Sequence, residues 1–267
     1  MMKTKVLQKA ESLVCRMLSR VKKMCLEREL LNCEFVPFIQ PIYRHHELVG
    51  CEVLLRVKKD GVYHLPGKYL KELETSKVIN DVTCELMEKV KVYFTGHMAS
   101  LPEGFYFSFN ICAKQLNVAK VVRAIHHFSE HFKGRAGLVL EIIERGTVEF
   151  DEFALDTMDE LVQKGIRFAI DDFGSGSSCL KYVEHVGFCM LKIDKSLTVI
   201  SDGKLVYSSV IDAIKTISHQ LQMQVIAEGV ETHEQLTLLQ DKGIENFQGY
   251  HFSRAITMHD FLNNFLK

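Results

Sequence analysis

Residues 166–172 have the sequence IRFAIDD, a short apolar run that ends in two adjacent aspartates. A run of this length with β-branched and aromatic residues is typical of a buried β-strand. The aspartates that end it, Asp171 and Asp172, carry like charges that repel each other, and burial makes both charges costly. Other residues of the chain, or bound cations, must therefore compensate the charge of these two aspartates.

Runs of the same kind recur along the chain, and amphipathic helical patterns separate most of them. The eight expected strands are residues 35–42, 48–57, 104–111, 137–143, 166–172, 189–194, 223–229 and 244–252. Helical patterns cover residues 114–132, 152–164, 204–221, 232–242 and 257–266. Eight strands with helical crossovers favour a closed parallel barrel over an open sheet. We therefore predict an α/β fold, a modified TIM (β/α)8 barrel preceded by an N-terminal helix.

The first two expected strands are joined by a short turn that contains Arg44, His45, His46 and Glu47. So short a connection joins antiparallel strands in a hairpin, whereas parallel strands need a longer crossover. We therefore expect one strand of the barrel to run antiparallel to the others.

Length and composition fit one barrel domain and argue against several classes of protein. A chain of 267 residues is normal for a single α/β barrel. With 47% apolar residues, 25% charged residues and a net charge of -1, nothing indicates a nucleic-acid polymer as partner. No apolar run reaches membrane-spanning length and no signal-peptide pattern is found, so we expect a cytoplasmic protein without a membrane span. The eight cysteines show no C-x-x-C pair, which predicts reduced core thiols.

Residues 1–33 differ from the rest of the chain and are predicted to form a basic amphipathic helix. Their basic residues are Lys3, Lys5, Lys9, Arg16, Arg20, Lys22, Lys23 and Arg28. Spacings of three and four residues place one apolar seam along this helix, formed by Leu7, Ala10, Val14, Met17, Val21 and Met24. Three interpretations remain open: the helix packs on the domain of residues 34–267, it mediates self-association, or it binds an anionic surface.

Polar residues recur at the ends of the expected strands, where the apolar runs stop. They are Gln40, Glu52, Asn110, Glu141, Asp171, Asp172, Lys192, Asp194, Glu228 and Gln248. In a parallel barrel the carboxyl ends of the strands meet on one face, so these side chains are expected to share a single cleft. A carboxylate paired with a base or capping a helix is the ordinary explanation for any one of them. It does not explain why acids recur at the same end of several strands.

A cluster of five carboxylates needs a counter-charge, and this one contains Glu52, Glu141, Asp171, Asp172 and Glu228. Without a counter-charge they repel each other or take up protons, and Lys192 alone cannot neutralise them. Two hard divalent cations can, with Asp171 bridging them and Asn110 adding a neutral oxygen. The absence of clustered His or Cys at these strand ends favours Mg²⁺ or Mn²⁺ over Zn²⁺. Hydrolysis of a phosphodiester uses two ions of this kind.

The same residues carry a resemblance to the EAL-domain phosphodiesterases, which hydrolyse the bacterial second messenger cyclic di-GMP to linear pGpG. The naming motif occurs as EVLLR at residues 52–56. The chain also contains FIQPIY, FNICAKQL, LEIIERG, DDFGSGSSCL, LKIDKS, VIAEGVET and NFQGYHFSR. So many motifs in one order, over about residues 34–264, make the match specific.

By motif position, the resemblance implies two metal sites and a catalytic lysine. The ligands of the first ion would be Glu52, Asn110, Glu141 and Asp171. The residues that bind or serve the second would be Asp171, Asp172 and Glu228. Lys192 would hold the attacking water or a phosphate oxygen, and Glu228 is also the family's candidate general base.

The resemblance also implies supporting roles around these metal sites. Glu144 corresponds to the glutamate that holds the loop after Asp172 in place, and without it the second ion is expected to be lost. The substrate site would be lined by Gln40, Arg56 and Gln248. The fork of the Arg56 guanidinium suits a phosphate oxygen.

The chain departs from the family pattern at Val57, Cys112, Ser177 and Ala255, none of which is a predicted metal ligand. Ser177 lies in the segment that the resemblance links to dimer contacts, so turnover and its dependence on dimerisation are what it affects. The complete ligand set predicts an active phosphodiesterase, expected as a homodimer and open to a protein partner through the N-terminal helix. The alternative is an EAL-fold regulatory module that binds cyclic di-GMP or a protein with little or no hydrolysis.

Overall fold

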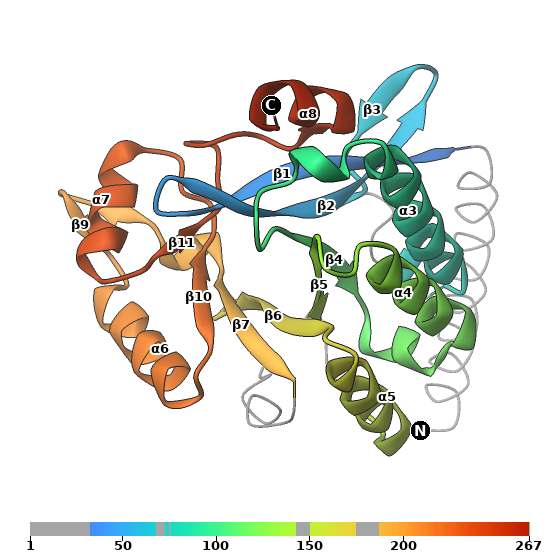
Figure 1. Ribbon diagram of the computed structural model, residues 1–267. Coiled ribbons are helices and arrows are strands. Elements are labelled where there is room, and N and C mark those ends of the chain that lie inside the picture. The colour runs from blue at the N-terminus through green and yellow to red at the C-terminus, as the bar shows by residue number, and fades with distance from the viewer. Residues whose placement is uncertain (1–32, 68–72, 75, 143–149, 175–186, 267) are drawn as a thin grey trace, which may run out of the picture.

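A closed barrel of eight strands forms the centre of the protein (Figure 1). The computed structural model describes residues 33–67, 73–74, 76–142, 150–174 and 187–266. The barrel strands are β1 (Glu34–Arg44), β2 (Glu47–Lys59), β4 (Tyr106–Ile111), β5 (Gly137–Ile142), β6 (Arg167–Phe173), β7 (Phe188–Ile193), β10 (Gln224–Ala227) and β11 (Asn246–Phe247). They pair in the order β1-β11-β10-β7-β6-β5-β4-β2, and the ring closes because β2 also pairs with β1. This confirms the predicted modified (β/α)8 barrel.

One strand, β1, runs against its neighbours. Parallel pairing joins the successive strands from β2 round to β11, whereas β1 is antiparallel to both β2 and β11. The short β1–β2 turn makes this possible, because His45 adopts a φ of 54° and Arg44 pairs with Glu47 across the turn. The single antiparallel strand expected from the sequence is therefore β1.

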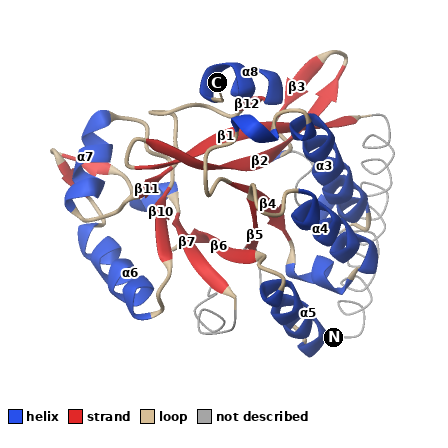
Figure 2. Cartoon of the chain, in the orientation of Figure 1, coloured by secondary structure: helices blue, strands red, loops and turns tan. Residues whose placement is uncertain are grey.

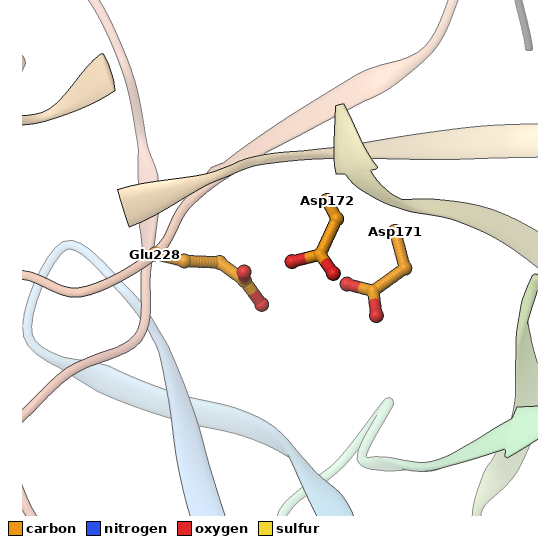
Figure 3. Close-up of side chains that lie close together, drawn as sticks. All are labelled: Asp171, Asp172 and Glu228. Carbon is orange, nitrogen blue, oxygen red and sulfur yellow. The ribbon is translucent and has the colours of Figure 1, made fainter. Parts of the chain in front are cut away.

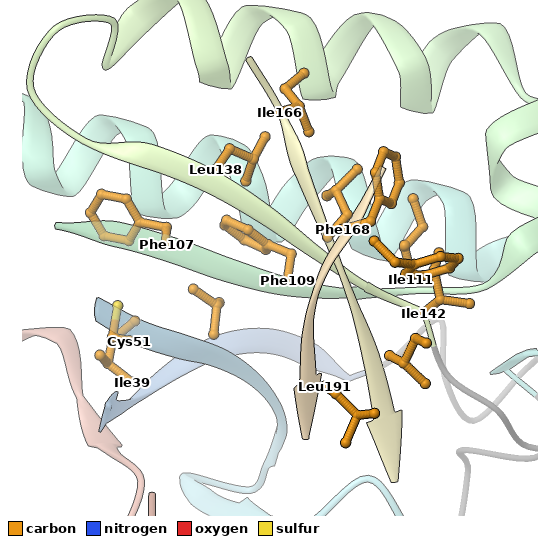
Figure 4. Packing of buried hydrophobic residues seen from close by; sticks show 14 of the residues in the cluster. Ile39, Cys51, Phe107, Phe109, Ile111, Leu138, Ile142, Ile166, Phe168 and Leu191 are labelled. Carbon is orange, nitrogen blue, oxygen red and sulfur yellow. The ribbon is translucent and has the colours of Figure 1, made fainter. Parts of the chain in front are cut away.

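Side chains of the strands alternate between the inside of the barrel and the helices outside it. An apolar floor fills the inside and consists of Ile42, Tyr106, Val139, Ala169, Met190 and Ile226. Neighbouring residues in the sequence point outward into the main core, as Phe107, Leu138 and Phe168 do in Figure 4. Burial on both faces explains why these strands are nearly continuous apolar runs.

Helices cover the outside of the barrel (Figure 2). They are α3 (Val78–Thr95), α4 (Ala119–His131), α5 (Glu152–Gln163), α6 (Ser208–Gln220), α7 (His233–Asp241) and α8 (Met258–Phe265). Side-chain caps begin three of them, because Asp151, Thr232 and Thr257 each accept a hydrogen bond from a backbone N–H of the first turn. The sequence patterns predict all of these helices except α3.

Several short elements differ from the sequence expectation. The outer strands are β3 (Val62–His64), which extends the β2 hairpin, and β12 (Ile256–Thr257), which pairs with β1. A hairpin of β8 (Ile200–Ser201) and β9 (Lys204–Leu205) occupies the start of a predicted helix, so that α6 begins only at Ser208. The described residues also form the 3-10 helices η1 (Met98–Ser100), η2 (Ala113–Asn117) and η4 (Lys195–Leu197).

Some predictions fall on parts of the chain that the structure does not describe. Glu144, Ser177 and the predicted helix of residues 1–33, except for its last residue, lie outside the described residues. Among the helices that are described, none is long and apolar enough to cross a membrane. Cys51, Cys84, Cys112 and Cys189 carry free thiols, as predicted, and of these Cys51 is buried while the other three are partly exposed.

Candidate active site

The polar strand ends meet in one cleft above the apolar floor. Side chains alternate along a strand, so the residue two positions beyond a floor residue points to the same inward face. Four cleft residues follow floor residues in this way, namely Glu141 after Val139, Asp171 after Ala169, Lys192 after Met190, and Glu228 after Ile226. Strand pairing sets Asn110 beside Glu141. The structure therefore brings together the carboxylates that the sequence places at separate strand ends.

Lys192 lies at the centre of the cleft, and only 1% of its side chain is exposed. Its Nζ lies 2.7 Å from Glu141 Oε2 and 2.7 Å from Glu228 Oε1. It also lies 3.2 Å from Glu52 Oε2 and 3.4 Å from Asp171 Oδ1. One ammonium group thus contacts four carboxylates, which leaves most of their negative charge without a counter-charge in this group.

Side-chain amides fix the orientation of Glu52. Asn110 Nδ2 donates to Glu52 Oε1 at 2.7 Å, and Gln248 Nε2 donates to Glu52 Oε2 at 2.7 Å. Gln248 Nε2 also lies 3.3 Å from Gln40 Oε1, while Gln40 Nε2 donates to the carbonyl oxygen of Ser253 at 3.1 Å. Gln40 and Gln248 therefore form a chain of hydrogen bonds behind Glu52. The side-chain oxygen of Gln248 is buried without a hydrogen-bond partner among the described residues.

The backbone at the end of β6 directs two consecutive carboxylates into the cleft. A regular strand would turn Asp171 and Asp172 to opposite faces. Asp172 instead has a φ of 52°, and the β6–β7 pairing is irregular between Ile170 and Phe173. Figure 3 shows both aspartates directed toward Glu228. One carboxylate oxygen from each of these three residues lies within 4.8 Å of the others, a spacing compatible with a shared metal ion.

Burial and mutual repulsion shift the pKa values of the cluster. Burial raises the pKa of Glu228 to about 8, and the charges of Asp171 and Glu52 add to the effect while Lys192 opposes it. Burial, reinforced by Glu52, raises the pKa of Glu141 well above its usual range, and burial also raises the pKa of Asp171. For Glu52 burial is outweighed by Lys192 and the amide hydrogen bonds, so its pKa is lowered.

The pKa of Lys192 shows which charge dominates the cleft. Burial acts to lower this pKa, but the surrounding carboxylates outweigh it and raise the pKa well above its ordinary value. Lys192 therefore stays protonated, and the excess negative charge of the cluster attracts protons or further cations. The group of Asp171, Asp172 and Glu228 offers only carboxylate oxygens, which are the ligands that hard divalent cations prefer.

We expect the metal-free protein to lose stability as the pH rises from about 5 to about 8. Folded Glu228 keeps its proton up to a pKa of about 8, whereas its ordinary pKa is 4.5. Between these values the folded state binds more protons than the unfolded chain, so the free energy of unfolding falls as the pH rises. Urea unfolding in the presence of EDTA measures this, with an expected loss of a few kcal/mol that Mg²⁺ restores at the higher pH. A metal-free protein that is more stable at the higher pH contradicts this assignment of charge.

Two cavities border the carboxylate cluster. One, of about 280 Å³, has a polar end formed by Glu52, Asn110, Asp171, Asp172 and Glu228, and it continues past Arg56 to apolar residues of α3. The other, of about 340 Å³, is lined by residues that include Gln40, Glu52, Glu228 and Gln248. All three residues that the sequence assigns to substrate binding therefore line a cavity at the cluster.

Two further predicted residues have defined contacts near the cleft. The Arg56 guanidinium carbon lies 5.3 Å from the centre of the Phe38 ring, and Nη1 donates to the carbonyl oxygen of Leu55 at 2.9 Å. Asp194, another of the polar strand ends, lines the second cavity, accepts a hydrogen bond from the Ser196 N–H at 3.0 Å and caps η4. Arg56 thus borders the cleft, while Asp194 stabilises a neighbouring turn.

The sequence analysis does not predict one residue that contacts the carboxylate cluster, Ser108. The hydroxyl of Ser108 donates to Glu141 Oε1, and its residue is fully buried. Ser108 precedes Asn110 by two positions on β4, so the strand period that places Asn110 in the cleft also places Ser108 on the inward face. The two-residue period of the strand could therefore have identified Ser108 from the sequence.

Comparison with known proteins decides the family. The sequence model described as the EAL domain matches residues 25–255. The chain belongs to the EAL domain family. Among curated relatives, this EAL protein is 34% identical over 239 residues to "Probable cyclic di-GMP phosphodiesterase PdeG" of Escherichia coli (strain K12), covering 88% of this chain and 47% of PdeG. It is 29% identical over 242 residues to "Cyclic di-GMP phosphodiesterase PdeL" of the same organism, covering 89% of this chain and 67% of PdeL.

Solved structures of EAL proteins share the fold. The EAL enzyme Bd1971 in its cAMP- and cyclic-di-GMP-bound form matches with a TM-score of 0.81 at 26% identity, covering 92% of this chain and 69% of that chain. The PaMucR phosphodiesterase in complex with c-di-GMP matches with a TM-score of 0.70 at 25% identity, covering 85% of this chain and 99% of that chain. Among the curated relatives, the EAL protein described here spans about half the length of PdeG and about two thirds that of PdeL.

Proposed function

We propose that this EAL protein hydrolyses cyclic di-GMP to linear pGpG in a reaction that requires divalent metal ions. The observation that carries the proposal is the set of four carboxylates that contact Lys192 at the barrel mouth. Such an excess of buried negative charge is costly unless cations compensate it. PdeG and PdeL, by their names, act on cyclic di-GMP, and the two similar solved structures were determined with cyclic di-GMP bound.

Two ions are proposed, and the oxygen donors favour Mg²⁺ or Mn²⁺. The ligands of the first would be Glu52, Asn110, Glu141 and Asp171. The residues that hold the second would be Asp171, Asp172 and Glu228, whose carboxylate oxygens already lie within 4.8 Å of one another. When bound, such ions lower the pKa of a water molecule and stabilise negative charge on phosphoryl oxygens. Glu144 would hold the loop that follows Asp172.

Lys192 and Glu228 would handle the water and its proton. The Lys192 ammonium group lies in direct contact with the carboxylate of Glu228 at 2.7 Å, so a water bound beside this pair would meet a donor and an acceptor next to each other. Burial raises the pKa of Glu228 above that of an ordinary carboxylate, which makes it a stronger proton acceptor. We therefore assign the orientation of the water to Lys192 and the acceptance of its proton to Glu228.

The substrate would lie across the two cavities that border the cluster. Arg56 would bind a phosphate oxygen through its planar guanidinium fork, which the cation–π contact with Phe38 helps to orient. The buried side-chain oxygen of Gln248 would accept a hydrogen bond from the substrate or a water, with Gln40 holding the amide in place.

Product analysis tests the proposal and separates it from a binding role. Purified protein is incubated with cyclic di-GMP and Mg²⁺ or Mn²⁺, and the nucleotides are separated by chromatography. We expect linear pGpG as the product with the wild type and none with Glu52→Ala. Tight binding of cyclic di-GMP without pGpG under both metals would instead support the alternative of a regulatory binding module.

Dimerisation, the N-terminal helix and the cellular location stay predictions. We propose a homodimer in the cytoplasm. The helix of residues 1–33 would pack on the barrel, join two copies, or bind an anionic surface or a protein partner. Deleting residues 1–30 and measuring solution scattering tests whether this helix joins two copies. An unchanged oligomeric state would rule out self-association through this segment.

A further inference from the structure

Ser108 occupies the boundary between the apolar floor and the layer of predicted metal ligands. Along the inward face of β4, Tyr106 belongs to the floor, Ser108 follows it and Asn110 reaches the cleft. Ser108 is 0% exposed, and Glu141 on the neighbouring strand is 1% exposed. Strand pairing sets Ser108 opposite Val139 and Asn110 opposite Glu141. The serine hydroxyl therefore lies one layer below the carboxylate to which it donates.

The two oxygens of Glu141 are held by different donors. The Ser108 hydroxyl donates to Oε1, and Lys192 Nζ donates to Oε2 at 2.7 Å. A single donor leaves a carboxylate free to rotate about its last side-chain bond, whereas one donor on each oxygen fixes its plane. With Ser108 on the floor side, the Oε2 atom is directed toward Lys192, where Glu52 and Asp171 also meet.

We infer that Ser108 is a positioning residue that orients Glu141 for metal binding. This inference rests on the proposed metal-dependent function, because Glu141 is a ligand only in that proposal. Without the hydroxyl, Oε1 faces the apolar floor without a hydrogen-bond donor. Either oxygen of Glu141 can then turn to accept from Lys192, so the carboxylate no longer has one fixed orientation. Outer-layer hydrogen bonds of this kind typically contribute about 10-fold to 100-fold to metal affinity.

The test is direct Mn²⁺ binding to metal-free protein, measured by calorimetry and by electron paramagnetic resonance. We expect Ser108→Ala to weaken Mn²⁺ binding by about 10-fold to 100-fold and Ser108→Thr, which keeps the hydroxyl, to stay within about threefold of the wild type. Ser218→Ala is the matched control, because Ser218 is also a buried serine but its hydroxyl donates to the carbonyl oxygen of Lys215 on α6. Its Mn²⁺ affinity is expected to be unchanged.

Thermal unfolding in EDTA separates positioning from a merely structural role. A Ser108→Ala protein that melts at a lower temperature but binds Mn²⁺ as tightly as the wild type overturns the inference. If Ser108→Ala does not fold, Ser108→Cys replaces it, because a thiol is close to the hydroxyl in size and is a weaker donor. Failure of the wild type itself to bind Mn²⁺ overturns the proposed function, and this inference with it.

Discussion

Replacing Asp171 by asparagine is expected to lower kcat/KM for cyclic di-GMP by about a thousandfold or more, which corresponds to about 4 kcal/mol of transition-state stabilisation. Asp171 is the one residue that both proposed metal sites share. An asparagine has the same size but no negative charge, so both sites lose part of their attraction for a cation. Initial rates of pGpG formation at saturating Mn²⁺ measure the loss.

The stability of the same variant distinguishes a lost ligand from a damaged fold. Lys192 still contacts Glu52, Glu141 and Glu228 when Asp171 is neutral, and removing one of several like charges relieves repulsion. We therefore expect the metal-free Asp171→Asn protein to be at least as stable as the wild type. Asp212→Asn, at an exposed ion pair with Lys242, is the control with full activity. Wild-type rates in Asp171→Asn would remove this residue from the metal sites.

Replacing Lys192 by methionine is expected to cost about 3 to 5 kcal/mol of stability in metal-free protein near pH 8, and to abolish activity. Methionine fills a similar volume but leaves the buried carboxylates without their central positive charge. Protonation relieves this cost, because without Lys192 the carboxylates take up protons more readily in the folded state than in the unfolded chain. The deficit should therefore shrink as the pH is lowered toward about 5.

Urea unfolding at the two pH values measures this effect, and a partly exposed lysine at the surface provides the control. Lys242 forms an ion pair with Asp212 in which 28% of the lysine side chain and 53% of the aspartate side chain are exposed. Exposed pairs contribute about 1 kcal/mol or less, so Lys242→Met should be nearly neutral at both pH values. Equal stability of Lys192→Met and Lys242→Met near pH 8 would contradict the central electrostatic role of Lys192.

The sequence predicts the barrel because each strand has its own apolar run. The prediction of element boundaries fails where tertiary contacts decide where an element begins or ends. The run at residues 166–172 corresponds to β6 within one residue. By contrast, the run at residues 244–252 corresponds to only two residues of β11. After Gln248 the backbone packs against Val230, whose carbonyl oxygen accepts a hydrogen bond from the His251 N–H, and position 249 requires glycine because a Cβ there would lie 2.2 Å from that oxygen. That close approach of two backbones has no local signal in the sequence.

The helix α3 was missed for a different reason. Its buried residues Val82, Leu86 and Val90 have the helical spacing of four, so the signal was present in the sequence. The hairpin of β8 and β9 is a converse case: the first residues of the predicted helix, Lys204 and Leu205, form strand β9 instead, which a turn at Asp202 with a φ of 51° pairs with β8. At this hairpin the pairing of two strands overrides the local helical pattern.

In the candidate site, too, some features are predictable from the sequence and others depend on tertiary contacts. Carboxylates at successive strand ends predict a shared cleft, since parallel strands align their ends, and the structure places them around Lys192. The left-handed backbone of Asp172 could not be predicted, because it depends on the irregular pairing of β6 with β7. The second hydrogen bond of Glu141, from Ser108, depends on the register between β4 and β5.

The most direct test of the proposed chemistry is removal and return of the metal on one sample of wild-type protein. The protein is stripped with EDTA, and pGpG formation from cyclic di-GMP is followed before and after Mn²⁺ is added back. We predict no measurable hydrolysis in the stripped protein and recovery of the original rate with Mn²⁺. Hydrolysis at the full rate after stripping, or no hydrolysis with Mn²⁺ or Mg²⁺ at any concentration, would contradict a metal-dependent phosphodiesterase at this cleft.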